Sequence, residues 1–387
     1  MRILYHHRTQ AEDGQAVHIR ALQRAFRELG HEVREFALVA RRDGAPAAPQ
    51  RASPWALVTR APRWVRELAE YAYGPLARGG LIRAARDLDA EVIYERYAFG
   101  NTAGITAARR LEVPLVLEVN SPMVLELSRT RGLGMPRVAE RMERHIFQSA
   151  DLVCVVTEVL RDMLVGMGVA RERLLVTPNG VHPEAYAQPD RARARTELGL
   201  SEADGGCVLG FTGYYRDWHR LDLVLDALAA PALAEARLVL VGEGPAHAAL
   251  ERRARDSGLA GRVHFAGPRA HAAVPALLAA FDVALVPAIN PYASPLKLYE
   301  YLAAGLAVVA PDQPNLRECL VDGDNALLVP PGDGAALTGA LTRLVGDPAL
   351  RERLGARARA TIVERDLTWR GNARRVVDAV ARLRARD

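Results

Sequence analysis

Residues 291–305 contain the side chains with the clearest capacity for chemistry in this sequence. Residues 296–304 carry apolar and small side chains at helical spacing, and Pro295 suits the first turn of such a helix. The start of a helix leaves backbone N–H groups unpaired, here those of Leu296, Lys297 and Leu298. Free N–H groups, the positive end of the helix dipole and a lysine together predict an anion-binding site.

Two side chains of this helix extend the prediction. Lys297 is the only lysine in a chain with 51 basic residues, so all the others are arginines. Lysine and arginine differ in shape and hydration, which favours a specific role for Lys297, although an exposed helix lysine that arose by chance is the alternative. Glu300 lies one turn further on and could accept hydrogen bonds from sugar hydroxyl groups. We therefore expect a site for a phosphate and an adjoining sugar.

Composition indicates a globular protein without a membrane span. The 387 residues suffice for two domains, half of them are hydrophobic, and a quarter are charged. No apolar run approaches the roughly 20 residues that cross a bilayer, and the first residues read as a strand rather than a signal peptide. We expect a cytoplasmic location. Three widely separated cysteines predict buried thiols rather than a disulfide framework or metal site: Cys154, Cys207 and Cys319.

The net charge of +5 would suit an anionic partner. However, arginines are scattered along expected helices and often neighbour acidic residues, as in residues 251–253 and 351–353. This pattern is typical of solvated helix faces. No recognised motif or aromatic platform accompanies the charge, so we expect no binding to nucleic acid.

Two series of six short apolar runs organise the chain. The first series lies within residues 3–176 and the second within residues 208–329, and helix-like segments separate the runs. This alternation predicts an α/β protein with two doubly wound, Rossmann-like parallel-sheet domains facing across a cleft. We place the first domain at residues 1–185, a linker at 186–206 and the second domain at 207–367, because prolines, charges and glycines interrupt the strand rhythm near the linker.

Ligands of such folds bind beyond the carboxyl ends of the strands, so the polar residues and glycines of these loops are the candidates for binding. After the first strand, Gly14 would permit close backbone approach, and His18 is more simply a packed histidine than a catalyst. In the second domain, Gly213, Gly242 and residues 265–269 occupy the corresponding loops. Arg216 could bind a diphosphate, with a surface ion pair to Asp217 or Asp222 as the alternative.

Together these features resemble glycosyltransferase family four, retaining enzymes of the GT-B architecture. The resemblance extends almost from end to end, and its motifs occur in the family's order. They include Gly14 with His18 and residues 29–33, 150–157, 177–181, 241–245, 265–267, 291–305 and 325–333. Residues 368–387 are similar to the terminal helix that crosses back onto the first domain in that family.

The resemblance implies roles for individual residues. Glu300 would hold the nucleotide ribose, and the amides of Leu296 and Lys297 would face the phosphate and sugar. Arg216 and Lys297 would neutralise the leaving diphosphate, without a metal or other cofactor. The residues expected to bind the nucleotide sugar donor are Gly14, Gly213, Gly242, Pro268, Arg269, Ser294, Leu296, Lys297, Leu298 and Glu300.

Three positions depart from the family pattern. Tyr292 replaces a frequent glutamate, and Asn120 stands where a histidine is common, so Asn120 can hydrogen-bond a sugar but cannot act as an acid or base. His219 and Arg220 replace a lysine-glycine pair. Lys297 would then supply the cation that is lost at position 219.

The leading hypothesis is transfer of a hexose to a hydroxyl-bearing small molecule or lipid-linked saccharide. A nucleotide-sugar epimerase of the same fold and a non-catalytic glycosyltransferase-like scaffold remain alternatives. Residues 55–66 mix tryptophans and arginines, among them Trp55, Arg60, Arg63, Trp64 and Arg66. They could rest on the inner face of an anionic membrane, although ordinary packing of the tryptophans is the simpler interpretation.

Overall fold

The computed structural model describes residues 1–9, 14–37, 62–200 and 206–385, and these residues form two compact units. The first unit comprises Met1–Pro178 together with Arg370–Asp387, and the second comprises Asn179–Trp369. Most of the tryptophan and arginine stretch at 55–66, including Trp55 and Arg60, lies outside the described residues.

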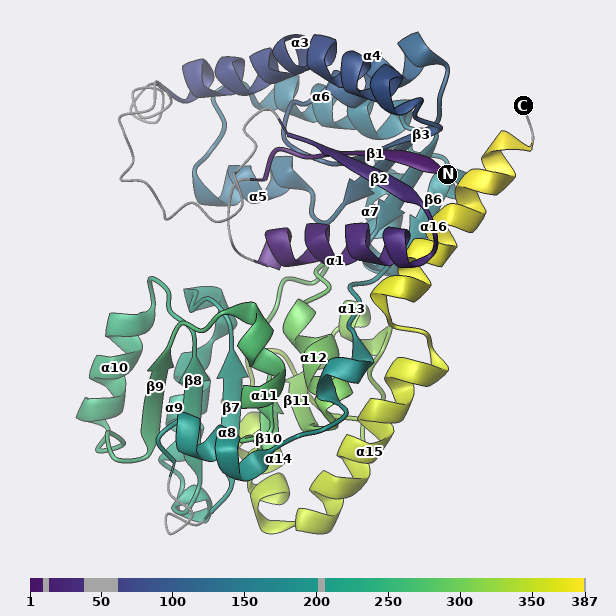
Figure 1. Ribbon diagram of the computed structural model, residues 1–387. Helices are drawn as coiled ribbons and strands as arrows, with labels where there is room; N and C mark the ends of the chain where they lie inside the picture. The colour runs from purple at the N-terminus through teal and green to yellow at the C-terminus, as the bar shows by residue number, and fades with distance from the viewer. Residues whose placement is uncertain (10–13, 38–61, 201–205, 386–387) are drawn as a thin grey trace. The chain divides into compact units, whose positions relative to one another are not determined.

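The first unit is built on one parallel sheet with the strand order β2-β1-β3-β4-β5-β6. Its strands are β1 (Arg2–His6), β2 (Glu32–Phe36), β3 (Val92–Arg96), β4 (Leu115–Val119), β5 (Leu152–Val155) and β6 (Leu174–Val176). Its helices are α1 (Gly14–Glu28), α3 (Arg63–Leu88), α4 (Ala103–Leu111), α5 (Met123–Thr130), α6 (Pro136–Ser149) and α7 (Glu158–Gly166). In Figure 1, α3, α4 and α6 cover one face of this sheet and α1 lies on the other.

Strands β3, β4 and β5 are buried along their whole length, as expected where helices cover both faces of a parallel sheet. Two of them nevertheless carry charged residues near their carboxyl ends. Glu95, Arg96 and Glu118 are all buried. Buried charges require partners, so this edge of the sheet contains a buried polar cluster.

The second unit repeats the design, with the strand order β12-β11-β10-β7-β8-β9. Its strands are β7 (Val208–Thr212), β8 (Arg237–Val241), β9 (Val263–Gly267), β10 (Val283–Leu285), β11 (Ala307–Pro311) and β12 (Leu327–Val329). Successive side chains of β8 alternate between two apolar cores, because Val239 and Val241 enter one and Leu238 and Leu240 the other. The sheet is therefore covered on both faces.

Helices follow nearly every strand of this unit. They are α8 (Arg191–Glu197), α9 (Leu221–Leu228), α10 (His247–Asp256), α11 (Val274–Leu278), α12 (Leu296–Ala304), α13 (Pro314–Arg317), α14 (Gly334–Gly346) and α15 (Pro348–Glu364). Helix α8 falls within residues 186–206, the segment expected to be a linker. Asp190 caps α8, and Ala194 and Leu198 enter a core of the second unit, so the described part of this segment is folded.

The last helix, α16 (Trp369–Arg384), returns the chain to the first unit. Arg384 forms an ion pair with Glu91 at 2.8 Å, and the amide of Asn372 donates to the carbonyl of Pro178. The prediction of two doubly wound parallel-sheet domains is confirmed, since each of the twelve apolar runs contributes a strand.

Candidate active site

Helix α12 begins as the sequence predicts, with one difference at its first turn. Pro295 is extended (φ −75°, ψ 125°) and precedes the helix instead of forming its first turn. The amide of Leu298 donates to the carbonyl of Pro295 at 3.0 Å, so the expectation that this amide is free is wrong. Within the described residues, the amides of Leu296 and Lys297 make no hydrogen bond. Two donors remain for a ligand at this helix start.

The side chain of Lys297 lies at the end of β7. Its Nζ atom is 3.7 Å from the ring centre of Phe211 and 3.5 Å from Nε2 of His219. A Cβ atom added to Gly213 would lie 2.8 Å from this Nζ atom, so a larger residue there would displace the ammonium group. Burial lowers the pKa of Lys297 to about 7, with the charge of Glu300 acting in the opposite direction.

His219 ends a short 3-10 helix, η4 (Asp217–His219), and is buried. Its Nδ1 atom lies 3.3 Å from the amide of Arg216, and its ring meets the ring of Phe211 edge to face. Burial, and then the charge of Lys297, lower the pKa of His219 to about 2. His219 is therefore neutral, and Lys297 is the member of this pair that can carry a charge near neutral pH.

Hydrogen bonds join the loops after β7, β8 and β9. The amide of Gly213 donates to Val241 O at 2.9 Å, and the amide of Gly242 donates to Gly267 O at 2.9 Å. Gly242 has φ +136°, and a Cβ atom there would lie 2.0 Å from the carbonyl oxygen of Gly213. This close approach requires glycine and brings Gly213 and Gly242 together at the carboxyl edge of the sheet.

Pro268 and Arg269 continue from Gly267 and are exposed. The guanidinium of Arg269 donates only to the carbonyl of Pro268, at 3.1 Å, among the described residues. The two residues stand in the loop that follows β9, where the sequence places them, and Arg269 can turn toward a ligand.

The carboxylate of Glu300 is held by a residue that sequence reasoning missed. Its Oε1 atom lies 2.6 Å from Nε2 of His271, on the short 3-10 helix η6 (His271–Ala273). Glu300 is buried, whereas the His271 side chain is about half exposed. The only sequence signal for His271 was its place two residues after Arg269. This contact orients the carboxylate that is expected to bind ribose.

Arg216 is exposed, and its guanidinium lies 4.8 Å from the ring centre of Tyr214. The alternative of a surface ion pair is not found: among the described residues Arg216 forms none, and Asp222 pairs with Arg220 at 3.0 Å. Arg216 borders a hollow of about 410 Å³, which Arg220 and Arg253 also line. Its guanidinium group can therefore bind an anion without first breaking an ion pair.

Two residues expected to bind the donor point into the protein. The hydroxyl of Ser294 accepts from the amide of Asn179 at 3.0 Å and is 2.8 Å from the hydroxyl of Tyr299. The Leu298 side chain is fully buried in the core. Both residues shape the loop and the helix, since neither presents a free polar group to a ligand.

In the first unit, Asn120 and Gly14 follow the ends of β4 and β1, respectively. Gly14 is the exposed first residue of α1. The Asn120 amide donates to Oε1 of Glu118 at 2.5 Å. Asn120 is thus anchored to a buried carboxylate.

Glu118 is the centre of this buried cluster. Its carboxylate lies 3.1 Å from Nε2 of His18, accepts from the hydroxyl of Tyr94 at 3.0 Å, and pairs with Arg96. Burial raises the pKa of Glu118, but His18 and Arg96 outweigh burial and hold it below the usual range. His18 is therefore packed, as the simpler interpretation held. Glu118 was missed because it lies within an apolar strand segment.

No group of three or more metal-ligating side chains occurs among the described residues. No helix in those parts is both long and apolar enough to cross a membrane. Trp64, at the start of α3, is 52% exposed.

A helix start bearing a cation, with glycine loops at the carboxyl edge of a doubly wound sheet, is the arrangement of nucleotide-binding α/β proteins. Comparison with known proteins places the chain in a family. Residues 13–185 match the model for Glycosyltransferase Family 4, and residues 206–347 match the model for Glycosyl transferases group 1. The chain belongs to the family-four glycosyltransferases with the GT-B architecture.

Individual relatives agree with this assignment. The chain is 30% identical to a D-inositol 3-phosphate glycosyltransferase of Stackebrandtia nassauensis, over 69% of this chain and 63% of that protein. It is 27% identical to an MMP alpha-(1->4)-mannosyltransferase of Mycolicibacterium hassiacum, over 96% of both chains. Its fold is similar to that of HepE from Anabaena in complex with UDP, with a TM-score of 0.74, 19% identity, and coverage of 98% of this chain and 100% of HepE.

Proposed function

We propose that this protein transfers a sugar, with retention of configuration, from a nucleoside diphosphate sugar to a hydroxyl acceptor. The observation that carries the proposal is the position of Lys297. Its ammonium lies against Gly213, and its own amide and that of Leu296 are free at the start of α12. Glu300 stands one turn further on. Cation, amides and carboxylate match a diphosphate followed by a ribose.

The proposed chemistry needs no metal or other cofactor. The bond between the anomeric carbon and the diphosphate oxygen breaks, and the acceptor oxygen bonds to that carbon on the same face. The acceptor's proton passes to the leaving phosphate. Lys297, Arg216 and the two free amides would stabilise the negative charge that develops on the leaving oxygen. Since the pKa of Lys297 is about 7, an arriving diphosphate would favour its charged form.

The donor site can be tested by thermal unfolding with UDP, GDP, ADP, CMP and dTDP. A ligand at about 100 times its dissociation constant adds roughly 2.7 kcal/mol of stability. We expect one nucleotide to raise the melting temperature, and Lys297→Ala and Glu300→Ala to reduce the shift. No shift with any nucleotide would contradict the proposed donor site.

A non-catalytic scaffold is the second candidate, and two departures from the family pattern favour it. Tyr292 is buried and replaces the frequent glutamate, and Asn120 is bound to Glu118. Nucleotide binding without release of sugar from any tested donor, with or without added acceptor alcohols, would support a scaffold. Conversion of one nucleotide sugar into its epimer would support an epimerase. Free sugar or a glycoside in the product mixture supports the transferase.

We propose polysaccharide, glycolipid or natural-product biosynthesis as the setting, with an acceptor on the side of the first unit. The family resemblance and the names of the relatives support this setting. A peripheral contact with the inner face of a membrane is part of this proposal, because Trp64 and Arg63 are exposed at the start of α3. Changing Arg60, Arg63 and Arg66 together to Gln should weaken sedimentation with anionic vesicles. Unchanged sedimentation would exclude the membrane contact.

A further inference from the structure

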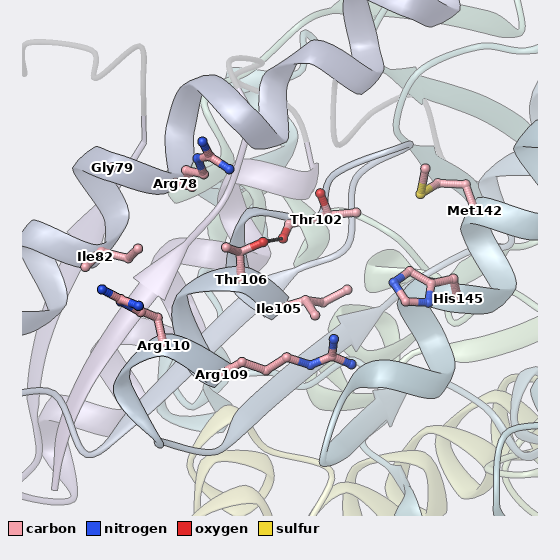
Figure 2. A pocket seen from close by; sticks show the side chains of 10 residues that line it. All are labelled: Arg78, Gly79, Ile82, Thr102, Ile105, Thr106, Arg109, Arg110, Met142 and His145. Atoms are coloured by element: carbon pink, nitrogen blue, oxygen red, sulfur yellow. Dashed lines mark hydrogen bonds between the residues drawn. The ribbon is translucent and has the colours of Figure 1, made fainter.

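The helical layer of the first unit contains a basic hollow of about 840 Å³ between α3, α4 and α6 (Figure 2). Figure 2 shows the side chains of Arg78, Arg109 and Arg110 around its rim, with Ile105 between them and His145 across from them. Every residue that lines the hollow belongs to the first unit. The hollow is therefore independent of the donor site proposed in the second unit.

The three arginines at the rim have no acidic partner. Within the described residues, Arg78, Arg109 and Arg110 form no ion pair, whereas Arg2, Arg8 and many others do. Arg109 reaches only the hydroxyl of Ser149, at a long 3.4 Å. Three neighbouring guanidinium groups without a carboxylate repel one another and attract an anion.

Helix electrostatics explain part of this arrangement. Arg109 and Arg110 lie in the last turn of α4, where cations offset the negative end of the helix dipole. Arg78 lies in the middle of α3, where no such effect acts. Helix electrostatics therefore do not explain why arginines from both helices line the hollow.

The floor of the hollow is apolar. Ile105 is buried, and Ile82 and Met142 are half buried. The hydroxyl of Thr106 donates to the carbonyl of Thr102 at 3.1 Å, so its proton is already used. The strong donors are therefore the guanidinium groups, which suit a phosphate, and the floor suits an apolar group attached to it.

The hollow extends along the whole of α4, because Thr102 at the start of this helix and Arg109 and Arg110 in its last turn all line it. Arg109 and Arg110 end α4, which leads into the amino end of β4 at Leu115. At the opposite end of α4, the amide of Gly104 donates to the buried carboxylate of Glu95 at 3.0 Å. The amide of Gly104 is thus already paired with an anion inside the unit, so the anion-binding groups of the hollow are the guanidinium groups.

We propose that this hollow binds a phosphate monoester that carries an apolar group. A soluble metabolite and the headgroup of an acidic phospholipid share this chemistry. In either case residues of the first unit alone bind the ligand.

The test measures binding of phenyl phosphate to the full chain by calorimetry, with phenol as the neutral counterpart. The lining variant is Arg78→Gln/Arg109→Gln/Arg110→Gln. The control variant, Arg83→Gln/Arg86→Gln/Arg144→Gln, removes the same charge from α3 and α6 outside the hollow, at exposed arginines that form no ion pair among the described residues. A second arm measures sedimentation with phosphatidylcholine vesicles, with and without phosphatidic acid.

We expect the lining variant to lose roughly tenfold or more in affinity for the phosphate, because hydrogen bonds to charged groups are strong. The control should bind as the wild type does, and phenol should not bind. If only the lining variant loses affinity for phenyl phosphate, the ligand is a soluble ester. If the lining variant loses only its binding to vesicles with phosphatidic acid, the ligand is a lipid headgroup. Equal losses of affinity in the lining and control variants would overturn the proposal. The absence of wild-type binding to both phenyl phosphate and the vesicles would also overturn it. Unfolding curves of both variants report whether either fails to fold.

Discussion

The Nζ atom of Lys297 lies 3.5 Å from Nε2 of His219, although the two residues are 78 positions apart. Two groups that can each carry a positive charge thus share one buried site at the end of β7. The arrangement is tolerable because the pKa of His219 falls to about 2 and that of Lys297 to about 7. Near neutral pH the empty site therefore carries little positive charge, and we expect the charge of Lys297 to increase when an anion binds.

Nucleotide binding should consume a proton. At pH 8, Lys297 is mostly neutral in the empty site, and a bound diphosphate would raise its pKa and protonate it. Calorimetric titrations in Tris and in phosphate buffer should then give different apparent enthalpies of binding. The difference should vanish in Lys297→Met. Equal enthalpies in both buffers at pH 8 would contradict this protonation.

His219 should make the protein sensitive to acid. Its pKa is lowered to about 2 by burial and by Lys297, so the unfolded chain binds a proton below about pH 6.5 and the folded chain does not. The free energy of unfolding must then fall as the pH drops from 6.5 toward 2. In urea unfolding at pH 7 and pH 5, His219→Gln should lose less stability than the wild type. Parallel losses in both proteins would show that His219 does not contribute.

Gly242→Ala should both destabilise the protein and impair nucleotide binding. A Cβ atom there would lie 2.0 Å from the carbonyl oxygen of Gly213, at φ +136°. We expect a loss of roughly 1–3 kcal/mol from backbone strain, or more if the Gly213 loop is displaced. The matched control is Gly339→Ala in α14, where nothing lies within 4 Å. It should add about 0.5–1 kcal/mol in urea unfolding because alanine favours helix.

His271→Ala should alter recognition of the ribose more than of the diphosphate. His271 holds Oε1 of Glu300 at 2.6 Å, so its removal leaves the carboxylate less fixed. We expect the preference for a nucleoside diphosphate over its 2′-deoxy and 3′-deoxy forms to shrink severalfold in the variant. Affinity for inorganic pyrophosphate should stay unchanged. If His271→Ala keeps the wild-type preference for ribose, Glu300 does not depend on His271 for its orientation.

Most of the strands were predictable from sequence because they are short apolar runs. Leu115–Val119 and Leu327–Val329 are two of them, whereas β2 carries three charged residues and is largely exposed. The start and end of α12 followed from Pro295 and Gly305, which cannot continue a helix in their observed conformations. Local residue types thus determine the elements and, through their order, the parallel sheets.

The internal contacts of the site were not predictable in this way, because they join loops that are distant in sequence. The pairing of His271 with Glu300 spans 29 positions, and that of Ser294 with Asn179 spans 115. The role of Glu118 was also hard to predict because it is the only charged residue in the apolar strand β4, and one charge in such a strand indicates no function by itself. Its partners, His18 and Arg96, come from two other elements.

Helix α16 has a consequence for how the protein is made. The first unit needs residues 370–387, so a ribosome has already released the whole of the second unit before the first can be completed. Within the second unit, the first and last segments are also hydrogen-bonded together, since Val181 bridges to Thr368. During synthesis, the second unit can finish folding while the first still lacks its last helix. The N-terminal half of this chain is the last to mature.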